Sequence, residues 1–407
     1  MTSRGTTGTG GRPRLPRAVW LVSWTSLLTD TASEVIYPLM PVYLTRVLGG
    51  NALSLGVIEG LAEGLNSILK VLAGRWSDRL GARKRLMIAG YALSTLVRPL
   101  VSLAASWTQV LGVRLADRVG KGLRGAPRDA LIASWVDPSI RGYAFGLNRS
   151  MDHTGAVVGP VLATVFLWFF PEQYRVLFAL TIIPGIAAVL MLLPVPDVRP
   201  APAAPAVAGP AAVPAGGRLN PALYRYFGVL LLFSLGNSTD AFLLLRLNDA
   251  GVGATWIPLS WAALHVVKAV TSPVGGYLSD RISRKAMIVS GWAIYAGVYA
   301  AFAWVTSLPA LGAVFLTYGV YYGLTEGVEK AAVADLAPPD ARGLAFGVYG
   351  AVVGIGALLA SLIFGAIWKL AGAPAAFWTG AGLAAVSAVL LLGLRMPRRE
   401  SSAPVAP

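Results

Sequence analysis

The fold is decided by a short stretch, Gly74-Arg75-Trp76-Ser77-Asp78-Arg79, that returns later in the chain as Gly276-Tyr277-Leu278-Ser279-Asp280-Arg281. A second stretch behaves in the same way, because Arg141-Gly142-Tyr143-Ala144-Phe145-Gly146 returns as Arg342-Gly343-Leu344-Ala345-Phe346-Gly347. The two pairs of copies are separated by almost the same number of residues. This regular spacing indicates two halves that share one fold, and it predicts an internally duplicated protein.

The composition is that of a membrane protein. Apolar residues make up 56% of the chain and charged residues 13%, with a mean hydropathy of +0.64, whereas soluble domains average about 45–50% and about 25%. Because a helical span needs about 20 mostly apolar residues, we expect twelve membrane spans joined by short links. They cover residues 18–47, 53–76, 85–105, 108–134, 142–169, 173–195, 222–247, 254–278, 286–306, 308–336, 343–371 and 374–396.

The positive charge of the chain is distributed in a way that sets its orientation. The formal net charge is +15, but the basic residues form short clusters between apolar spans, so no nucleic-acid partner is expected. Alternate loops are nearly free of Lys and Arg, and the positive-inside rule then places both termini in the cytoplasm. We expect a multi-pass protein of the cytoplasmic (inner) membrane of a prokaryote, surrounded by membrane lipid. The clusters include Arg79, Arg83, Lys84 and Arg85; Arg281, Arg284 and Lys285; and Arg395, Arg398 and Arg399.

A linker rich in Pro, Ala and Gly separates the two halves. We expect an N-terminal six-helix bundle over residues 1–196, a cytoplasmic linker over 197–220, a C-terminal six-helix bundle over 221–397 and a cytoplasmic tail over 398–407. Two such halves, related by an axis along the membrane normal, can hold a solute site between them and expose it to each side by rocking. Each chain contains a complete duplicated pathway, so a monomer is expected. The alternative is a membrane sensor or scaffold that transports nothing.

The loop after the second span resembles the signature of the major facilitator superfamily, and this resemblance extends over nearly the whole chain. The loop reads Gly74-Arg75-Trp76-Ser77-Asp78-Arg79-Leu80-Gly81-Ala82-Arg83-Lys84. Its first Gly allows two helices to approach closely, and Asp78 is placed to pair with a cation or with the N-terminal dipole of a neighbouring helix. The second copy departs from the pattern after Ile282, where Ser283 replaces Gly.

The family resemblance implies an all-α membrane fold of twelve transmembrane helices in two pseudo-symmetric six-helix bundles. It also implies a latch on the cytoplasmic side that breaks and reforms as the halves rock. A basic loop that only sets the topology is the alternative, but it leaves the repeated Asp unexplained. The gating residues that we expect are Gly74, Asp78, Arg79, Asp280 and Arg281.

Two further motifs resemble family patterns that bear on coupling and direction. The fourth span contains Arg118-Val119-Gly120-Lys121-Gly122, in which Lys121 stands where the family has Gln. The resemblance implies that Arg118 tunes proton coupling by stabilising the charged form of a nearby carboxylate. The fifth span resembles an antiporter motif, although Ala163-Thr164 replaces the usual pair of glycines, and it favours efflux. Its residues are Gly146, Gly155, Gly159 and Pro160, where the glycines thin one helix face and the proline bends the helix.

Ionisable residues at membrane depth are the candidates for chemistry, because each costs about 2.5–3.5 kcal/mol at the bilayer centre. Asp30 lies near the middle of the first span and Glu34 follows one turn later. These two are the first candidates for proton acceptors or cation ligands, and Glu63 is the next. A structural ion pair of the first two carboxylates with Arg149 or Arg118 is the alternative.

Other polar residues inside the spans are candidates for contact with the solute. His265 holds the position in the second half that Glu63 holds in the first, which indicates a cavity location. Most of these residues recur three, four or seven positions apart, so each helix turns one polar face inward. The expected solute-binding residues are Arg114, Lys121, Arg149, Asp152, Asp240, His265, Lys268, Tyr322, Glu326 and Glu329.

The sequence contains no signature of an enzyme or of an ATP-driven pump. It has no ATP-binding loop, no Ser/His/Asp arrangement, no metal-ligand tract and no cysteine, so no cofactor and no metal site are expected. We therefore expect secondary active transport driven by a proton gradient. Proton-coupled efflux of a small organic compound or a metal ion is the leading version. Proton-coupled uptake of a polar or anionic metabolite is the alternative, which Arg114, Lys121, Arg149 and Lys268 would support by holding an anion.

Overall fold

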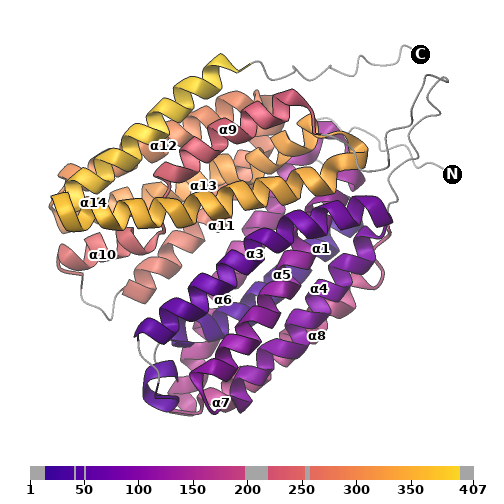
Figure 1. Cartoon of the computed structure of the whole chain (residues 1–407), viewed down its shortest axis with the longest axis vertical. Coiled ribbons are helices and arrows are strands. Elements are labelled where there is room, and N and C mark those ends of the chain that lie inside the picture. The colour runs from indigo at the N-terminus through magenta and orange to yellow at the C-terminus, as the bar shows by residue number, and fades with distance from the viewer. Residues whose placement is uncertain (1–13, 41–42, 50–51, 198–218, 253–256, 395–407) are drawn as a thin grey trace.

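The computed structural model describes residues 14–40, 43–49, 52–197, 219–252 and 257–394. Within these ranges the regular structure is helical, and no strand is present. Most of the expected linker and the whole expected tail lie outside the described residues, so the domain boundaries stay predictions. Figure 1 shows two groups of helices side by side, with the N-terminal half in indigo to magenta and the C-terminal half in red to yellow.

The N-terminal half consists of six spans, several of which are interrupted or end in tighter turns. The first span is shorter as an α-helix than the sequence predicts, because it ends at Ile36 and continues as short 3-10 and π turns. The elements are α1 (Arg17–Ile36), η1 (Tyr37–Leu39), η2 (Tyr43–Val47), α3 (Ala52–Leu80), α4 (Arg83–Val97), η3 (Arg98–Leu103), α5 (Trp107–Trp135), η4 (Pro138–Ile140), α6 (Arg141–Phe169), α7 (Tyr174–Leu180) and α8 (Ile182–Leu192).

The C-terminal half repeats this arrangement. Its last element comprises two spans that meet at Gly372, where φ is 87°, a left-handed value that suits glycine. The break agrees with the expected end of the eleventh span. The elements are α9 (Pro221–Gly236), α10 (Ala241–Asp249), α11 (Ile257–Arg281), α12 (Arg284–Trp304), α13 (Leu308–Leu336), η6 (Pro339–Ala341) and α14 (Arg342–Gly393).

Side-chain caps start several of these helices. The side chains of Ser106, Asn220 and Ser283 each accept a hydrogen bond from a main-chain N–H three residues later. This explains the departure of the second repeat copy. The first turn uses Gly81 at φ 58°, whereas Ser283 caps α12 at φ −63°. The two loops therefore turn the chain by different local means.

The seventh span is broken, although the sequence predicts a continuous helix over 222–247. The α9 helix ends at Gly236 and α10 begins at Ala241. The main-chain oxygen of Asp240 accepts hydrogen bonds from the N–H groups of Leu243 and Leu244, so this residue starts the second segment. A break at membrane depth is tolerated where it is enclosed by protein or lines a cavity. It places a carboxylate at the junction of two short helices.

The surface and the helix lengths agree with a membrane environment. Large apolar side chains such as Leu103, Trp168 and Leu370 are exposed, as they are on helices that face lipid. The long helices α3, α5 and α11 contain more charged residues than a simple apolar span, among them Asp78, Asp129 and Lys268. Six described segments are long and apolar enough to cross a membrane by these criteria alone: Arg83–Leu103, Pro138–Phe169, Tyr174–Leu192, Arg284–Trp304, Leu308–Leu336 and Pro339–Gly393.

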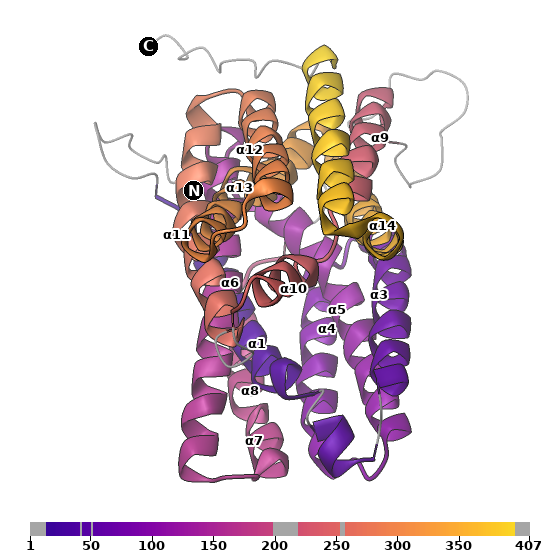
Figure 2. The same cartoon turned by 90° about the vertical axis from the view of Figure 1, so that its left-hand side faces the viewer.

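The most extensive contacts between the halves are made by two helix pairs, α3 with α14 and α6 with α11. Figure 2, in which the C-terminal half forms the upper part, shows both pairs at the junction. The close approach requires glycine. A Cβ added to Gly343 of α14 would lie 2.5 Å from the Gly74 oxygen of α3, and one added to Gly142 of α6 would overlap Gly276 of α11. The repeated glycines therefore bring the two halves into main-chain contact.

Candidate functional site

Asp78 joins the end of α3 to the start of α14 in the other half. Its carboxylate accepts hydrogen bonds from the main-chain N–H groups of Gly343 at 3.0 Å and Leu344 at 2.7 Å. These groups lie at the positive end of the α14 dipole. The guanidinium of Arg83 lies 2.7 Å from the same carboxylate and donates to the main-chain oxygen of Pro339 at 3.2 Å.

Asp280 makes the same contacts in the opposite direction. Its carboxylate accepts hydrogen bonds from the N–H groups of Gly142 at 2.9 Å and Tyr143 at 2.8 Å, at the start of α6. Arg284 lies 3.3 Å from Asp280 and donates to the oxygen of Pro138 at 3.2 Å. We call the two sets of contacts the latch, made by Asp78, Arg83, Asp280 and Arg284 with the N-termini of α14 and α6. It connects the halves twice.

The latch contains both carboxylates that the sequence predicts but not the two predicted arginines. The expected contact of Asp78 with a helix N-terminus is present, and the second copy makes it as well in spite of Ser283. Arg79 and Arg281, which we expected to take part, lie exposed. The cations that take part are Arg83 and Arg284, which the sequence indicated only as members of basic clusters. Their equivalent places in the two repeats are the signal that could have identified them.

The latch is not symmetric in charge. Asp335 of α13 contacts both Arg141, at 2.7 Å, and Arg284, at 2.5 Å. At the equivalent place in the first half Ser134 accepts a hydrogen bond from Arg83 at 3.3 Å. One side of the latch therefore has an extra carboxylate that the other side lacks.

A buried ion pair links the halves next to the latch. Asp129 of α5 contacts Lys330 of α13, and the two side chains are 8% and 4% exposed. Arg128 lies 3.0 Å from the same Asp129 carboxylate. Asp129 and Lys330 are separated by the same number of residues as Arg141 and Arg342, so they occupy equivalent positions in the two repeats. Equivalent residues that touch each other lie on the pseudo-two-fold axis. The sequence did not single out Asp129.

A second set of charges joins α6 to α13. Arg149 lies 2.9 Å from Asp152 in its own helix and 3.3 Å from Glu326 in the other half. The Nε2 atom of His153 is 2.9 Å from Glu326. Three expected solute-binding residues, Arg149, Asp152 and Glu326, therefore lie together at the junction of the halves.

Asp240, at the break between α9 and α10, is the centre of a polar cluster in the C-terminal half. Lys268 of α11 lies 3.0 Å from this carboxylate. The hydroxyl groups of Tyr318 and Tyr322, both on α13, donate to it at 2.7 Å and 3.1 Å. The Lys268 ammonium also lies 3.6 Å from the centre of the Tyr322 ring, a cation–π contact.

His265 lies one turn before Lys268 and faces the N-terminal half. Its ring centre is 4.6 Å from that of Trp261 and 5.3 Å from that of His153 in α6. The side chain is buried, with the residue 8% exposed. Neither ring nitrogen has a hydrogen-bond partner in the described part of the chain. The structure thus brings His265 to the junction, as its place in the repeat indicates.

The two α1 carboxylates pack against the glycines of α6. A Cβ added to Gly155 would lie 3.0 Å from Cβ of Asp30, and one added to Gly159 would lie 2.8 Å from Cβ of Glu34. Gly146, by contrast, faces α11. Two glycines of the expected antiporter motif therefore allow α1 to bring its carboxylates close to the α6 backbone, and Pro160 follows them within the helix.

The alternative, a structural ion pair of these carboxylates with Arg149 or Arg118, is absent from the described residues. Arg149 contacts Asp152 and Glu326, and Arg118 contacts Asp117 at 3.7 Å. Asp30 and Glu34 form no ion pair within the described residues. The side chain of the third candidate, Glu63, lies outside the described part of the chain.

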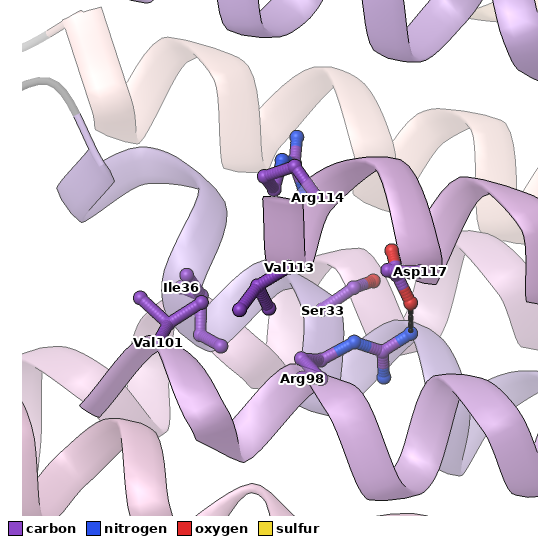
Figure 3. Close-up of a pocket in the computed structure, with 7 residues that line it drawn as sticks. All are labelled: Ser33, Ile36, Arg98, Val101, Val113, Arg114 and Asp117. Carbon is purple, nitrogen blue, oxygen red and sulfur yellow. Dashed lines mark hydrogen bonds and ion pairs between the residues drawn. The ribbon is translucent and has the colours of Figure 1, made fainter. Parts of the chain in front are cut away.

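A small pocket lies in the N-terminal half between α1, η3 and α5 (Figure 3). Arg98 donates to Asp117 at 3.0 Å and to the main-chain oxygen of Thr29 at 3.2 Å. Arg114 is buried at the edge of this pocket, whereas Lys121 is exposed. The residues that line the pocket are Ser33, Ile36, Arg98, Val101, Val113, Arg114 and Asp117.

Glu329 does not join the other expected solute-binding residues. It is buried inside the C-terminal half, where the Trp292 indole N–H and the Tyr349 hydroxyl each donate to it at 3.1 Å. These partners belong to α12 and α14 of the same half. The structure therefore places Glu329 within the packing of one bundle, and its role as a solute contact stays a prediction.

The fold and the site together define a class of protein. Two repeated helical halves enclose ionisable residues at membrane depth, and they are joined through main-chain contacts at one end. This is the architecture of a secondary membrane transporter in which the halves rock around a central site.

Comparison with known proteins identifies the family. The model of the Major Facilitator Superfamily matches residues 22–328 and 257–407, and the chain belongs to this superfamily. An uncharacterized MFS-type transporter of Methanocaldococcus jannaschii is 33% identical over 384 residues, which cover 93% of this chain and 95% of that protein. The multidrug resistance protein MdtH of Aeromonas hydrophila is 24% identical, covering 92% and 94%. The solved proton:xylose symporter XylE has a TM-score of 0.74 at 16% identity, covering 93% and 95%.

Proposed function

We propose that this transporter couples the efflux of a small organic solute to the inward movement of protons. The observation that carries the proposal is the position of Asp30 and Glu34. They lie inside the first span, against the glycines of α6, and form no ion pair within the described residues. Carboxylates that are not held in ion pairs can exchange protons as the halves move, whereas those bound to arginine are held in the charged form.

Two observations support the class of solute and the coupled exchange that we propose. The MdtH relative is a multidrug resistance protein by name, which favours an organic compound over a metal ion as the solute. The antiporter-like glycines pack directly on the proposed proton acceptors, so a shift of α6 against α1 changes the surroundings of these carboxylates. A coupled exchange of solute and proton follows from such an arrangement.

The latch gives the proposed cycle its gate. The contacts of Asp78 and Asp280 hold the halves together at one end, and we assign this end to the cytoplasmic side on the basis of the positive-inside rule. Both termini are then cytoplasmic and the membrane is the inner membrane of a prokaryote. In this conformation the cytoplasmic side is closed, and release of the solute occurs on the opposite side.

Proton-coupled uptake of an anionic metabolite is a second candidate function. Arg149 and Lys268 favour it, because both lie where the halves meet and both can hold an anion. A sensor or scaffold that transports nothing is the third candidate. It predicts no solute flux under any gradient.

The test is proton movement by purified protein in liposomes that contain a pH-sensitive dye. Cationic drugs and organic anions are added in turn, with a pH gradient in each direction. We expect Asp30→Asn and Glu34→Gln to abolish coupled proton movement, while Asp249→Asn, which changes an exposed carboxylate, leaves it intact. Coupled flux that persists in both α1 variants and in the double variant would refute the proton assignment.

A further inference from the structure

We propose that the solute carries a carboxylate, and that His265 and Lys268 of the C-terminal half bind this group. Trp261 and Tyr322 then contact the apolar body of the solute. The proposal rests on the proposed transport function and names the chemical class of the solute. It is independent of the direction of transport.

The first argument is the unused hydrogen-bonding capacity of His265. The residue is only 8% exposed, and neither ring nitrogen has a partner in the described part of the chain. A buried polar group without a partner is unfavourable unless a ligand or water satisfies it. The ring lies between Trp261 and His153, so a group bound to it is placed where the two halves meet.

The second argument is the unused capacity of Lys268. An ammonium group has three N–H donors, and in the described part of the chain the only oxygen acceptor within hydrogen-bond distance is the Asp240 carboxylate. The rest of the ammonium faces the Tyr322 ring. Because His265 and Lys268 are three residues apart on α11, they share one face of the helix. A carboxylate with two oxygens can accept from both.

The third argument concerns the carboxylates that a cationic solute would need. Asp240 already accepts from Lys268, Tyr318 and Tyr322. Glu326 is held by Arg149 and His153. These two carboxylates therefore already have donors, whereas His265 and Lys268 still have hydrogen-bonding capacity. This inventory favours an anionic group over an amine.

The site also has walls for an apolar body. Trp261 packs on His265, and the Tyr322 ring lies beside both Lys268 and His153. Aromatic rings bury a large apolar area with little loss of conformational freedom. His153 belongs to α6 and the other residues belong to α11 and α13. A solute bound here touches both halves, so its surroundings change when the halves rock.

The test is a binding measurement on purified full-length protein, because binding does not require transport. We expect benzoate to quench tryptophan fluorescence saturably and its neutral analogue benzamide to bind at least tenfold more weakly. His265→Phe, which keeps the packing, and Asp240→Asn/Lys268→Gln, which removes both charges of the buried pair, should each weaken benzoate binding at least tenfold. Lys369→Gln changes an exposed lysine and should leave binding unchanged.

The outcomes separate this inference from the transport proposal. Equal binding of benzoate and benzamide, benzoate binding that survives both variants, or no saturable binding by protein that melts cooperatively would overturn the carboxylate site. Benzoate binding that depends on His265 and Lys268 supports the site, whether or not liposomes show flux. Loss of flux in Asp30→Asn with normal benzoate binding would support the proton assignment separately.

Discussion

Replacing Asp129 by Asn tests whether the buried ion pair between the halves holds the latch end closed. The change leaves the Lys330 ammonium without its partner in a place where its side chain is 4% exposed. Removal of one member of a buried pair costs about 3–5 kcal/mol. In a conformation with the latch open, water reaches the ammonium and this cost disappears. The substitution therefore penalises the closed conformation selectively.

The size of the effect follows from that penalty. Each 1.36 kcal/mol is a factor of ten in an equilibrium constant, so the ratio of closed to open molecules should fall roughly a hundredfold to a few thousandfold. The reversed pair Asp129→Lys/Lys330→Asp should restore part of the closed population, because the two positions are equivalent in the repeat and face each other. Full restoration is not expected, since Arg128 lies 3.0 Å from the Asp129 carboxylate and would then repel a lysine.

The assay is a spectroscopic distance measurement across the latch end. The chain contains no cysteine, so spin labels can be attached to single cysteines introduced at the exposed positions Leu80 and Ile282. We expect the distance distribution of the Asp129→Asn protein to move to longer values. Asp340→Asn, which changes an exposed carboxylate at the same end, is the matched control. An unchanged distribution in Asp129→Asn, or a reversed pair as open as the single variant, would refute the reasoning.

Three further predictions concern the latch and use the same labels. Asp78→Asn removes the anion from the α14 N-terminus and should destabilise the closed state by about 1–3 kcal/mol, seen as more of the long distance. Gly343→Ala should have an effect of similar size, because its Cβ would lie 2.5 Å from the Gly74 oxygen. Gly382→Ala is the control, because its Cβ would meet nothing within 4 Å, and it should leave the distance distribution unchanged. Ser134→Asp gives Arg83 a second carboxylate and should favour the closed state by up to about 1 kcal/mol. A shift to longer distances would contradict the idea that a second carboxylate at this place stabilises the latch.

Several features of this protein could be read from the sequence because they depend on local composition and on repetition. The excess of apolar residues determined a membrane protein, and the repeated Gly-x-x-x-Asp-Arg segments determined two related halves. The kind of partner that Asp78 has was also predictable, since a carboxylate at a helix end pairs with a cation or with the N-terminus of a neighbouring helix, but which helix this is was not. His265 was found through its repeat position opposite Glu63.

Other features were decided only by the tertiary structure. The sequence offered many cations and carboxylates at helical spacing. Nothing local distinguishes the pair Asp129 and Lys330 from its alternatives, because the two residues belong to different halves and meet only through tertiary packing. The break before Asp240 did have a local signal, because residues 236–240 are turn-forming, but the apolar stretches on both sides favoured one continuous span. Composition determines the solvent in which a helix is stable, but the choice among buried charge partners is a long-range energy that depends on how the two halves pack.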